Sequence, residues 1–273
     1  MHLTFFIFFT TVTLACFSQS VSTGMGGRSL GLANATAAVP DEWSLRNNPA
    51  GMTQLTHTNI AFALQRMPML VGANRLAFVA NTPLSFGVIS AGGFRFGDDL
   101  YNEHLLSLGF AHAMGLASLG ARVDYIQYRA EGFATASSMG LSVGGLASLS
   151  SSVSVGAYVS NINRPRLPNN ERVPVQLVAG VSFKPNQHVL ITAEAMQYLD
   201  FYPTIKGAFE YSFKKKFFTR TGFNLLPNAG FFGLGLHAWR LKIDYAIQYS
   251  WTLSVSHQVS AIYQVNKKKR AAR

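Results

Sequence analysis

Apolar and polar residues alternate with a period of two along most of this chain, from Thr58 to Val265. The segment 240–249 shows the pattern well, because every second residue is apolar: Leu241, Ile243, Tyr245, Ile247 and Tyr249. Such alternation predicts β-strands with one apolar and one polar face. We predict about fourteen strands of roughly ten residues, the length with which a tilted strand crosses a bilayer. The expected spans are 58–65, 72–81, 84–95, 103–114, 117–128, 135–147, 152–161, 173–183, 188–198, 204–213, 217–224, 230–238, 240–249 and 256–265.

The connections between these strands alternate between short and longer ones. The short ones are Thr82–Pro83, Gly115–Leu116, Leu149–Ser152, Lys184–Gln187, Lys214–Lys216 and Trp239–Arg240. The longer ones are Arg66–Val71, Phe96–Asn102, Arg129–Ala134, Ile162–Arg172, Tyr198–Pro203, Leu225–Ala229 and Ser250–Val255. Transmembrane β-barrels have short periplasmic turns and longer external loops. The pattern therefore predicts an all-β fold, an antiparallel transmembrane barrel in the bacterial outer membrane, with both termini in the periplasm.

The composition agrees with a lipid-facing barrel. Hydrophobic residues make up 48% of the chain and charged residues only 13%, about half the usual share of roughly 25%. No apolar run reaches the roughly 18–20 residues of a helical membrane span. The apolar strand faces are thus expected to contact outer-membrane lipid. The net charge of +11 comes with basic clusters at Lys214–Lys216 and Lys267–Arg270, which lack interleaved aromatic residues, so we expect no nucleic-acid partner.

Two terminal regions flank the strands. Residues 1–20 are predicted to be a signal peptide, because Leu3–Ala15 is an apolar stretch of suitable length, although no Lys or Arg precedes it. Cys16 is the only cysteine, and the alternative of a lipoprotein site has Thr13 where leucine is usual. Residues 21–57 are rich in Gly, Ala and Asn and show weak periodicity. The strand region is 58–265, and 266–273 is a basic tail expected in the periplasm.

No motif for catalysis, phosphate binding or metal binding stands out, so we expect a non-enzymatic protein without a metal or cofactor. Eight polar residues are expected to face the barrel lumen: Arg122, Asp124, His188, Glu194, Lys206, Glu210, Lys242 and Asp244. Inward charges in a narrow barrel usually pair with one another, since an unpaired charge there is costly. The alternative is a proton site or a contact for a solute.

The segment before the first strand carries the most specific motif. It reads GGRSLGLANATAAVPDEWS from Gly26 to Ser44 and NNPAGM from Asn47 to Met52, and SHQVS follows at Ser256–Ser260. These motifs resemble the FadL-like outer-membrane proteins, most closely the PorV/PorQ proteins of Bacteroidetes. Met52 and Ala33 depart from the family's usual Leu and Gly. The resemblance implies that residues 21–57 form a plug in the lumen. Its motif residues are Arg28, Asp41, Trp43, Asn47, Asn48, Pro49, Ala50 and Gly51.

The resemblance implies two functions. A PorV/PorQ-type protein would assist type IX protein secretion, with secreted proteins or other envelope components as partners. A FadL-like protein would let hydrophobic small molecules pass. Short loops argue against a large cargo surface, and the plug sequence shows no apolar pocket for a fatty acid. The sequence favours the PorV/PorQ-type function, with passive transport as the alternative and a lumen-site enzyme as a third possibility.

Overall fold

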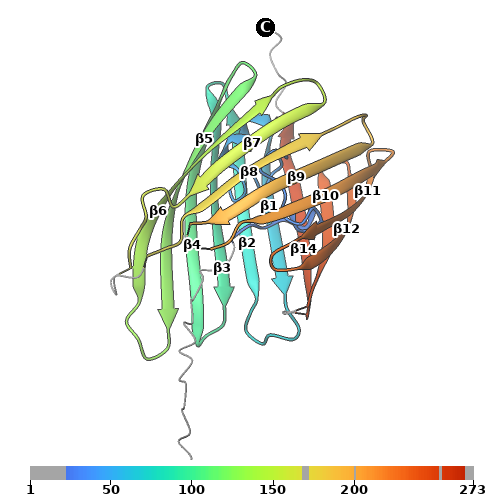
Figure 1. Ribbon diagram of the computed structural model, residues 1–273. Coiled ribbons are helices and arrows are strands. Elements are labelled where there is room, and N and C mark those ends of the chain that lie inside the picture. The colour runs from blue at the N-terminus through green and yellow to red at the C-terminus, as the bar shows by residue number, and fades with distance from the viewer. Residues whose placement is uncertain (1–22, 168–171, 200, 252–253, 268–273) are drawn as a thin grey trace, which may run out of the picture.

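The computed structural model describes residues 23–167, 172–199, 201–251 and 254–267. Fourteen antiparallel strands form one closed barrel in sequence order, and β1 closes it by pairing with β14 (Figure 1). The predicted fold class is confirmed. The strands are β1 (His57–Arg66), β2 (Arg75–Leu84), β3 (Gly87–Gly97), β4 (Tyr101–Met114), β5 (Ala117–Ala130), β6 (Ala136–Ser148), β7 (Val153–Ser160), β8 (Gln176–Phe183), β9 (Val189–Tyr198), β10 (Thr204–Phe213), β11 (Phe217–Asn224), β12 (Ala229–Ala238), β13 (Leu241–Ser250) and β14 (Ser254–Lys267).

Burial alternates along the strands as the sequence pattern does, but the exposed face is the apolar one. In β12, for example, Phe232, Leu234 and Leu236 are exposed. A water-soluble sheet would bury such side chains, whereas a transmembrane barrel turns them toward lipid. The opposite face points into the lumen and carries small and polar residues. No helix among the described residues is long and apolar enough to cross a membrane.

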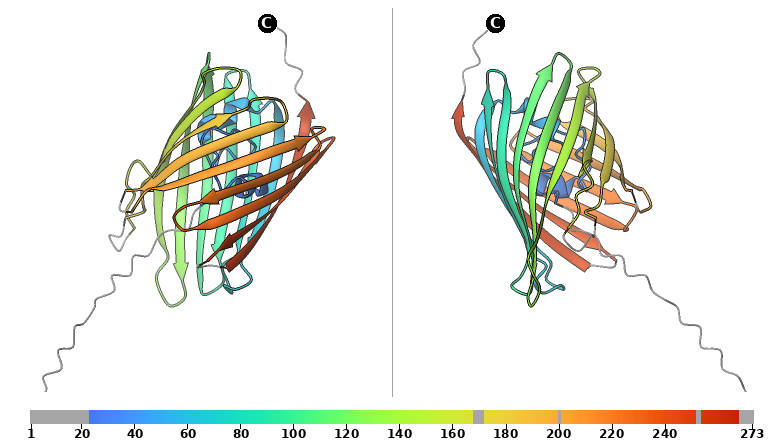
Figure 2. Two further views of the ribbon diagram at one scale, coloured as in Figure 1. Left: turned by 45° about the vertical axis from the view of Figure 1, so that its right-hand side comes forward. Right: turned by 90° about the vertical axis from the view of Figure 1, so that its left-hand side faces the viewer.

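The barrel wall is uneven in height. β4, β5 and β6 are the tall side, and Figure 2 shows them extending past their neighbours at one end. β7 pairs with β6 only along Val143–Ser148. Beyond that point, the side chain of Asn163 accepts a hydrogen bond from the amide of Leu141 (2.9 Å) and donates one to the carbonyl of Met139 (2.7 Å). The β7–β8 connection therefore continues the wall where β7 stops.

Several predicted connections differ from the observed ones. Thr82 and Pro83 lie within β2, and the turn falls at residues 85–86. The loop predicted over Phe96–Asn102 shrinks to residues 98–100, because the Asp98 carboxylate accepts hydrogen bonds from the amides of Leu100 and Tyr101. Most of the length difference between the two barrel ends thus rests on 67–74 and 161–175. We call the barrel end that carries these two connections the long-connection end, and the opposite end the tight-turn end.

The predicted terminal regions are only partly described. Residues 1–20, assigned to the signal peptide, lie outside the described residues, as do 268–273 of the basic tail. Lys267 still belongs to β14 and pairs with His57. The barrel therefore extends past the predicted end at 265.

Residues 23–56, the luminal segment, lie inside the barrel (Figures 1 and 2). The segment contains helix α1 (Gly27–Gly31), which contacts β11–β14, and the 3₁₀ helix η1 (Pro49–Gln54), which contacts β3–β6. Between them, the Ala35 carbonyl accepts a hydrogen bond from Thr192 of β9 and the Ala38 carbonyl accepts one from Ser182 of β8. The segment thus touches opposite walls of the lumen.

Inward-facing glycines let the segment approach the wall closely. A Cβ on Gly156 of β7 would overlap the carbonyl of Ala37, and one on Gly144 of β6 would overlap the side chain of Asn48. Glycine within a strand often marks a site where another backbone comes close. These strand glycines therefore leave the space that the luminal segment occupies against the wall.

Candidate functional site

A chain of buried charges lies on the β10–β13 side of the lumen. Glu210 accepts two hydrogen bonds from the Arg28 guanidinium (2.8 and 2.9 Å) and one from Arg220 (2.6 Å). Arg220 also donates to Asp244 (2.6 Å), and its side chain is fully buried. Each carboxylate faces a guanidinium, which offsets the cost of removing it from water. This chain links the luminal segment to β10, β11 and β13.

Two further ion pairs lie on this side of the lumen. Lys242 contacts Glu42 of the luminal segment (2.6 Å), and Lys206 contacts Glu194 (2.9 Å). Glu194 also accepts a hydrogen bond from the backbone amide of Ala37 (2.8 Å). Charged side chains of β9, β10 and β13 therefore hold the segment at several points. We call this the ionic side of the lumen.

A separate charged group lies on β5. Asp124 pairs with Arg122 (2.8 Å) and, more distantly, with Arg46 of the luminal segment (3.6 Å). Arg122 donates to the backbone carbonyls of Leu45 (2.7 Å) and Arg46 (3.1 Å). This guanidinium thus satisfies carbonyl groups of the segment that would otherwise be buried without a partner.

The structure places most of the predicted lumen residues on the inner face, but in separate groups. Arg122 and Asp124 are apart from the ionic side, which holds Glu194, Lys206, Glu210, Lys242 and Asp244. The placement of His188 in the lumen is wrong. β9 begins only at Val189, so His188 lies exposed in the preceding turn, with Nδ1 2.9 Å from the Ser212 carbonyl oxygen.

Arg220, which bridges Glu210 and Asp244, was not predicted from the sequence as a lumen residue. The alternation along β11 could have indicated it, because Thr219 and Thr221 face outward and Arg220 lies between them. Arg220 and Asn224 share the inward face.

The motif residues of the luminal segment fold its own turns. Asp41 accepts hydrogen bonds from the amide of Trp43 (2.9 Å) and from the hydroxyl of Ser29 (3.3 Å). Burial raises the pKa of Asp41 to about 6, against the lowering effect of the nearby Arg28 guanidinium. The indole of Trp43 is buried beside Gly26, where a Cβ would contact the ring. This part of the motif therefore stabilises the turn between α1 and η1.

The second part of the motif starts η1. Asn48 accepts from the amide of Ala50 (3.1 Å) as an N-cap and donates to the carbonyls of Ala37 (2.7 Å) and Gly145 (3.0 Å). Asn47 donates to the hydroxyl of Ser29 (2.9 Å). Pro49, Ala50 and Gly51 are buried within η1. The motif thus ties distant parts of the segment to one another and to β6.

An apolar cluster lies on the β1–β5 side of the lumen, among buried polar residues such as Asn81, Ser107 and Arg122. The luminal segment contributes Met25, Trp43, Leu45 and Met52. The strands contribute Ala61, Ala63, Ala77, Val79, Val88, Phe94, Leu105, Ala111 and Ile126, with Ile262 of β14. No apolar pocket was expected in the luminal segment from its sequence; its scattered apolar residues pack together against one wall. We call this cluster the apolar side.

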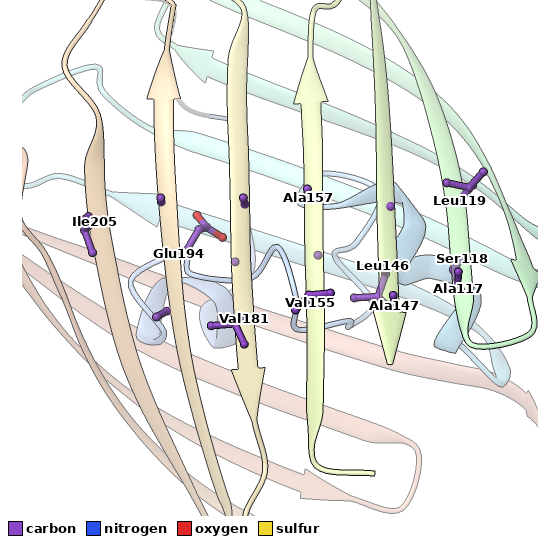
Figure 3. A pocket seen from close by; sticks show the side chains of 16 residues that line it. Ala117, Ser118, Leu119, Leu146, Ala147, Val155, Ala157, Val181, Glu194 and Ile205 are labelled. Carbon is purple, nitrogen blue, oxygen red and sulfur yellow. The ribbon is translucent and has the colours of Figure 1, made fainter. Parts of the chain in front are cut away.

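The cavities differ in size and place. The one beside Arg122, Asp124 and Tyr128 in the lumen measures about 40 Å³, which admits little more than water. A larger one of about 790 Å³ lies on the outer surface of β5–β10, where Leu119, Val181 and Ile205 are exposed (Figure 3). Among the described residues, no group of three or more His, Cys, Asp or Glu side chains forms a metal site.

The barrel resembles three solved outer-membrane proteins. The toluene transporter TbuX of Ralstonia pickettii aligns over 90% of this chain and 99% of its own, with a TM-score of 0.67 and 13% identity. The P. putida toluene transporter TodX aligns over 91% and 100%, with a TM-score of 0.67 and 12% identity. A Pseudomonas aeruginosa FadL homologue aligns over 90% and 98%, with a TM-score of 0.63 and 12% identity. This chain has a FadL-like barrel fold.

The comparisons confirm the FadL-like fold that the sequence motifs predicted. No protein-family model matches the sequence, and no curated protein matches it. The PorV/PorQ assignment therefore has no support from these comparisons. At 12–13% identity, the likeness concerns the FadL-like fold alone.

Proposed function

We propose that this chain forms a passage for small hydrophobic molecules through the bacterial outer membrane and that the luminal segment is its plug. The observation that carries the proposal is the apolar side of the lumen. The sequence analysis gave this function as the alternative to a role in secretion. The distribution of apolar side chains in the lumen reverses that preference.

The apolar side runs the height of the barrel. Val173 and the partly buried Leu167 and Tyr128 belong to it at the long-connection end. Val79 contributes from the middle of β2, and Val88 lies next to the tight turn between β2 and β3. A molecule moving along this side would exchange one apolar contact for the next, with little cost of desolvation.

The plug closes this route in the present conformation. Trp43, Leu45 and Met52 fill the lumen along β1–β5, and the adjoining cavity of about 40 Å³ is too small for a hydrocarbon. The contacts of Arg28 with Glu210 and of Glu42 with Lys242 hold the plug from the ionic side. Passage therefore requires the plug to shift away from the apolar side.

Toluene is the first substrate to test. TbuX and TodX are both described as toluene transporters, and a monoaromatic hydrocarbon carries no group that would need a polar partner along the apolar side. A role in type IX secretion stays a prediction without an observation in its favour, as does a PorV/PorQ-type set of envelope partners. The absence of enzymatic activity likewise stays a prediction.

Leu105→Asn is expected to lower toluene uptake several-fold, because it places an amide on the apolar side, where a passing hydrocarbon cannot satisfy it. Leu105 is buried and faces the lumen from β4. The measurement is uptake of radiolabelled toluene into proteoliposomes that contain the purified barrel. Such vesicles hold no secretion machinery, and uptake into protein-free vesicles is subtracted, because toluene also crosses lipid without a protein.

Leu190→Asn is the matched control. Leu190 is also buried and faces the lumen, but from β9, where it packs with Leu32, Val39 and Ala208. The same change in volume and polarity there should leave uptake near that of the wild type. Equal uptake by the two variants, with both folded by heat-dependent gel migration, would show that the apolar side is not the route.

A further inference from the structure

A pocket of about 290 Å³ opens on the lipid-facing surface of β2–β5. Leu76, Phe78, Leu106 and Tyr125 line it and are all exposed, so the pocket lies outside the barrel. Its lining also includes Gly93, over which the ring of Phe78 lies. The pocket opens toward lipid, and the strand positions of Phe94 and Leu105 separate it from the apolar side of the lumen.

Basic side chains border this pocket. Arg95 and His104 line it and are paired across β3 and β4, and His104 is paired with Gln127 of β5, another lining residue. Arg129 follows two positions after Gln127 on the same outward face. Arg129 is paired with Asn102 of β4, two positions before His104. Arg95, His104 and Arg129 therefore gather on one part of the outward face.

Asp99, an acidic neighbour of this group, interacts only weakly with Arg95. Asp99 lies 3.7 Å from Arg95, and both side chains are well exposed to solvent. An exposed pair of this kind contributes little, so it does not commit the Arg95 guanidinium. A stronger anion can take its place.

The position of the pocket limits the classes of ligand that can bind there. Arg95 and Arg129 lie near the ends of β3 and β5 at the long-connection end, which the proposed placement in the outer membrane puts outside. The apolar half of the pocket lies further along the strands, toward the middle of the wall. A ligand must therefore carry anionic groups at the membrane surface and hydrocarbon below them.

We propose that this pocket binds a phosphate-bearing glycolipid of the lipid A type. Its phosphate lies between Arg95, His104 and Arg129, and one acyl chain lies against Leu76, Phe78 and Leu106. Guanidinium groups match phosphate oxygens with paired hydrogen bonds. Contacts with these apolar side chains hold the acyl chain in one place, whereas a lipid that is not bound exchanges freely.

The test is native mass spectrometry of the purified full-length barrel in detergent, titrated with lipid A or with phosphatidylglycerol. The wild type should retain lipid A, and the double variant Arg95→Ala/Arg129→Ala should bind it about tenfold more weakly, since two charge-assisted hydrogen-bonding groups are lost. Arg240→Ala is the control, because Arg240 lies at the tight-turn end beside Trp239.

Three results would overturn the proposal. The double variant could retain lipid A as the wild type does, the control could lose it equally, or the wild type could prefer phosphatidylglycerol. The last result would show that the ligand is a phospholipid instead. Heat-dependent gel migration checks that every variant is folded before its lipid binding is compared.

Discussion

Arg220→Leu is expected to lower the free energy of unfolding by about 3–5 kcal/mol, the cost of removing one partner from a buried ion pair. Arg220 is buried between Glu210 (2.6 Å) and Asp244 (2.6 Å). Its removal leaves Asp244 without its guanidinium partner and Glu210 with Arg28 alone. Urea unfolding of the barrel in lipid vesicles, followed by tryptophan fluorescence, measures the loss.

Arg240→Leu is the matched control for this change. Arg240 lies in the turn between β12 and β13, and its guanidinium is 5.0 Å from the Trp239 ring centre. Its substitution should change the free energy of unfolding by about 0.5 kcal/mol or less, as at most surface sites. A loss of equal size in the two variants would contradict the view that the buried charge chain stabilises the barrel.

Gly156→Val is expected to displace the luminal segment from β7, because the new side chain would occupy the place of the Ala37 carbonyl. Overpacking of this kind typically costs about 1–3 kcal/mol. The displaced plug should also leak, so the single-channel conductance in a planar bilayer should rise above that of the wild type.

Gly230→Val provides the comparison on the outer face. Gly230 is exposed on β12, and a Cβ there meets no atom within 4 Å. The conductance and stability of this variant should match those of the wild type. A Gly156→Val barrel that also matched the wild type would mean that the luminal segment does not need its close contact with β7.

The strands could be read from the sequence because lipid and lumen impose opposite demands on alternate residues. β10 and β11 follow the predicted spans to the residue. The connections were harder to predict, because local side-chain contacts shorten them. The Asp98 carboxylate closes the turn after β3, and Pro83 is tolerated near the end of β2.

The candidate site was less accessible to sequence reasoning. Alternation indicated which charges face inward, but not that Glu210 and Asp244 share Arg220. That pairing depends on the register of β10, β11 and β13 around a segment from the other end of the chain. His188 had the right parity but lay outside its strand. The inward glycines, such as Gly156, were the one overlooked signal of close contact.

In the proposed mechanism, the two sides of the lumen have different roles. The ionic side holds the plug through contacts such as Arg28 with Glu210, which are specific and can be broken one by one. The apolar side provides the surface along which a hydrocarbon would move. The movement of the plug between these two sides is the step on which the proposed function depends.

A reversible crosslink between the plug and the wall tests this step most directly. A Cβ on Gly180 of β8 would lie 3.3 Å from the Cβ of Ala37, close to the roughly 3.5–4.5 Å span of a disulfide. Ala37→Cys/Gly180→Cys, combined with Cys16→Ser, leaves no other cysteine in the sequence. Toluene uptake into proteoliposomes in excess of that into protein-free vesicles should be blocked in the oxidised barrel and restored by a reducing agent. Equal uptake before and after reduction, with the disulfide verified by mass spectrometry, would contradict a plug that must move.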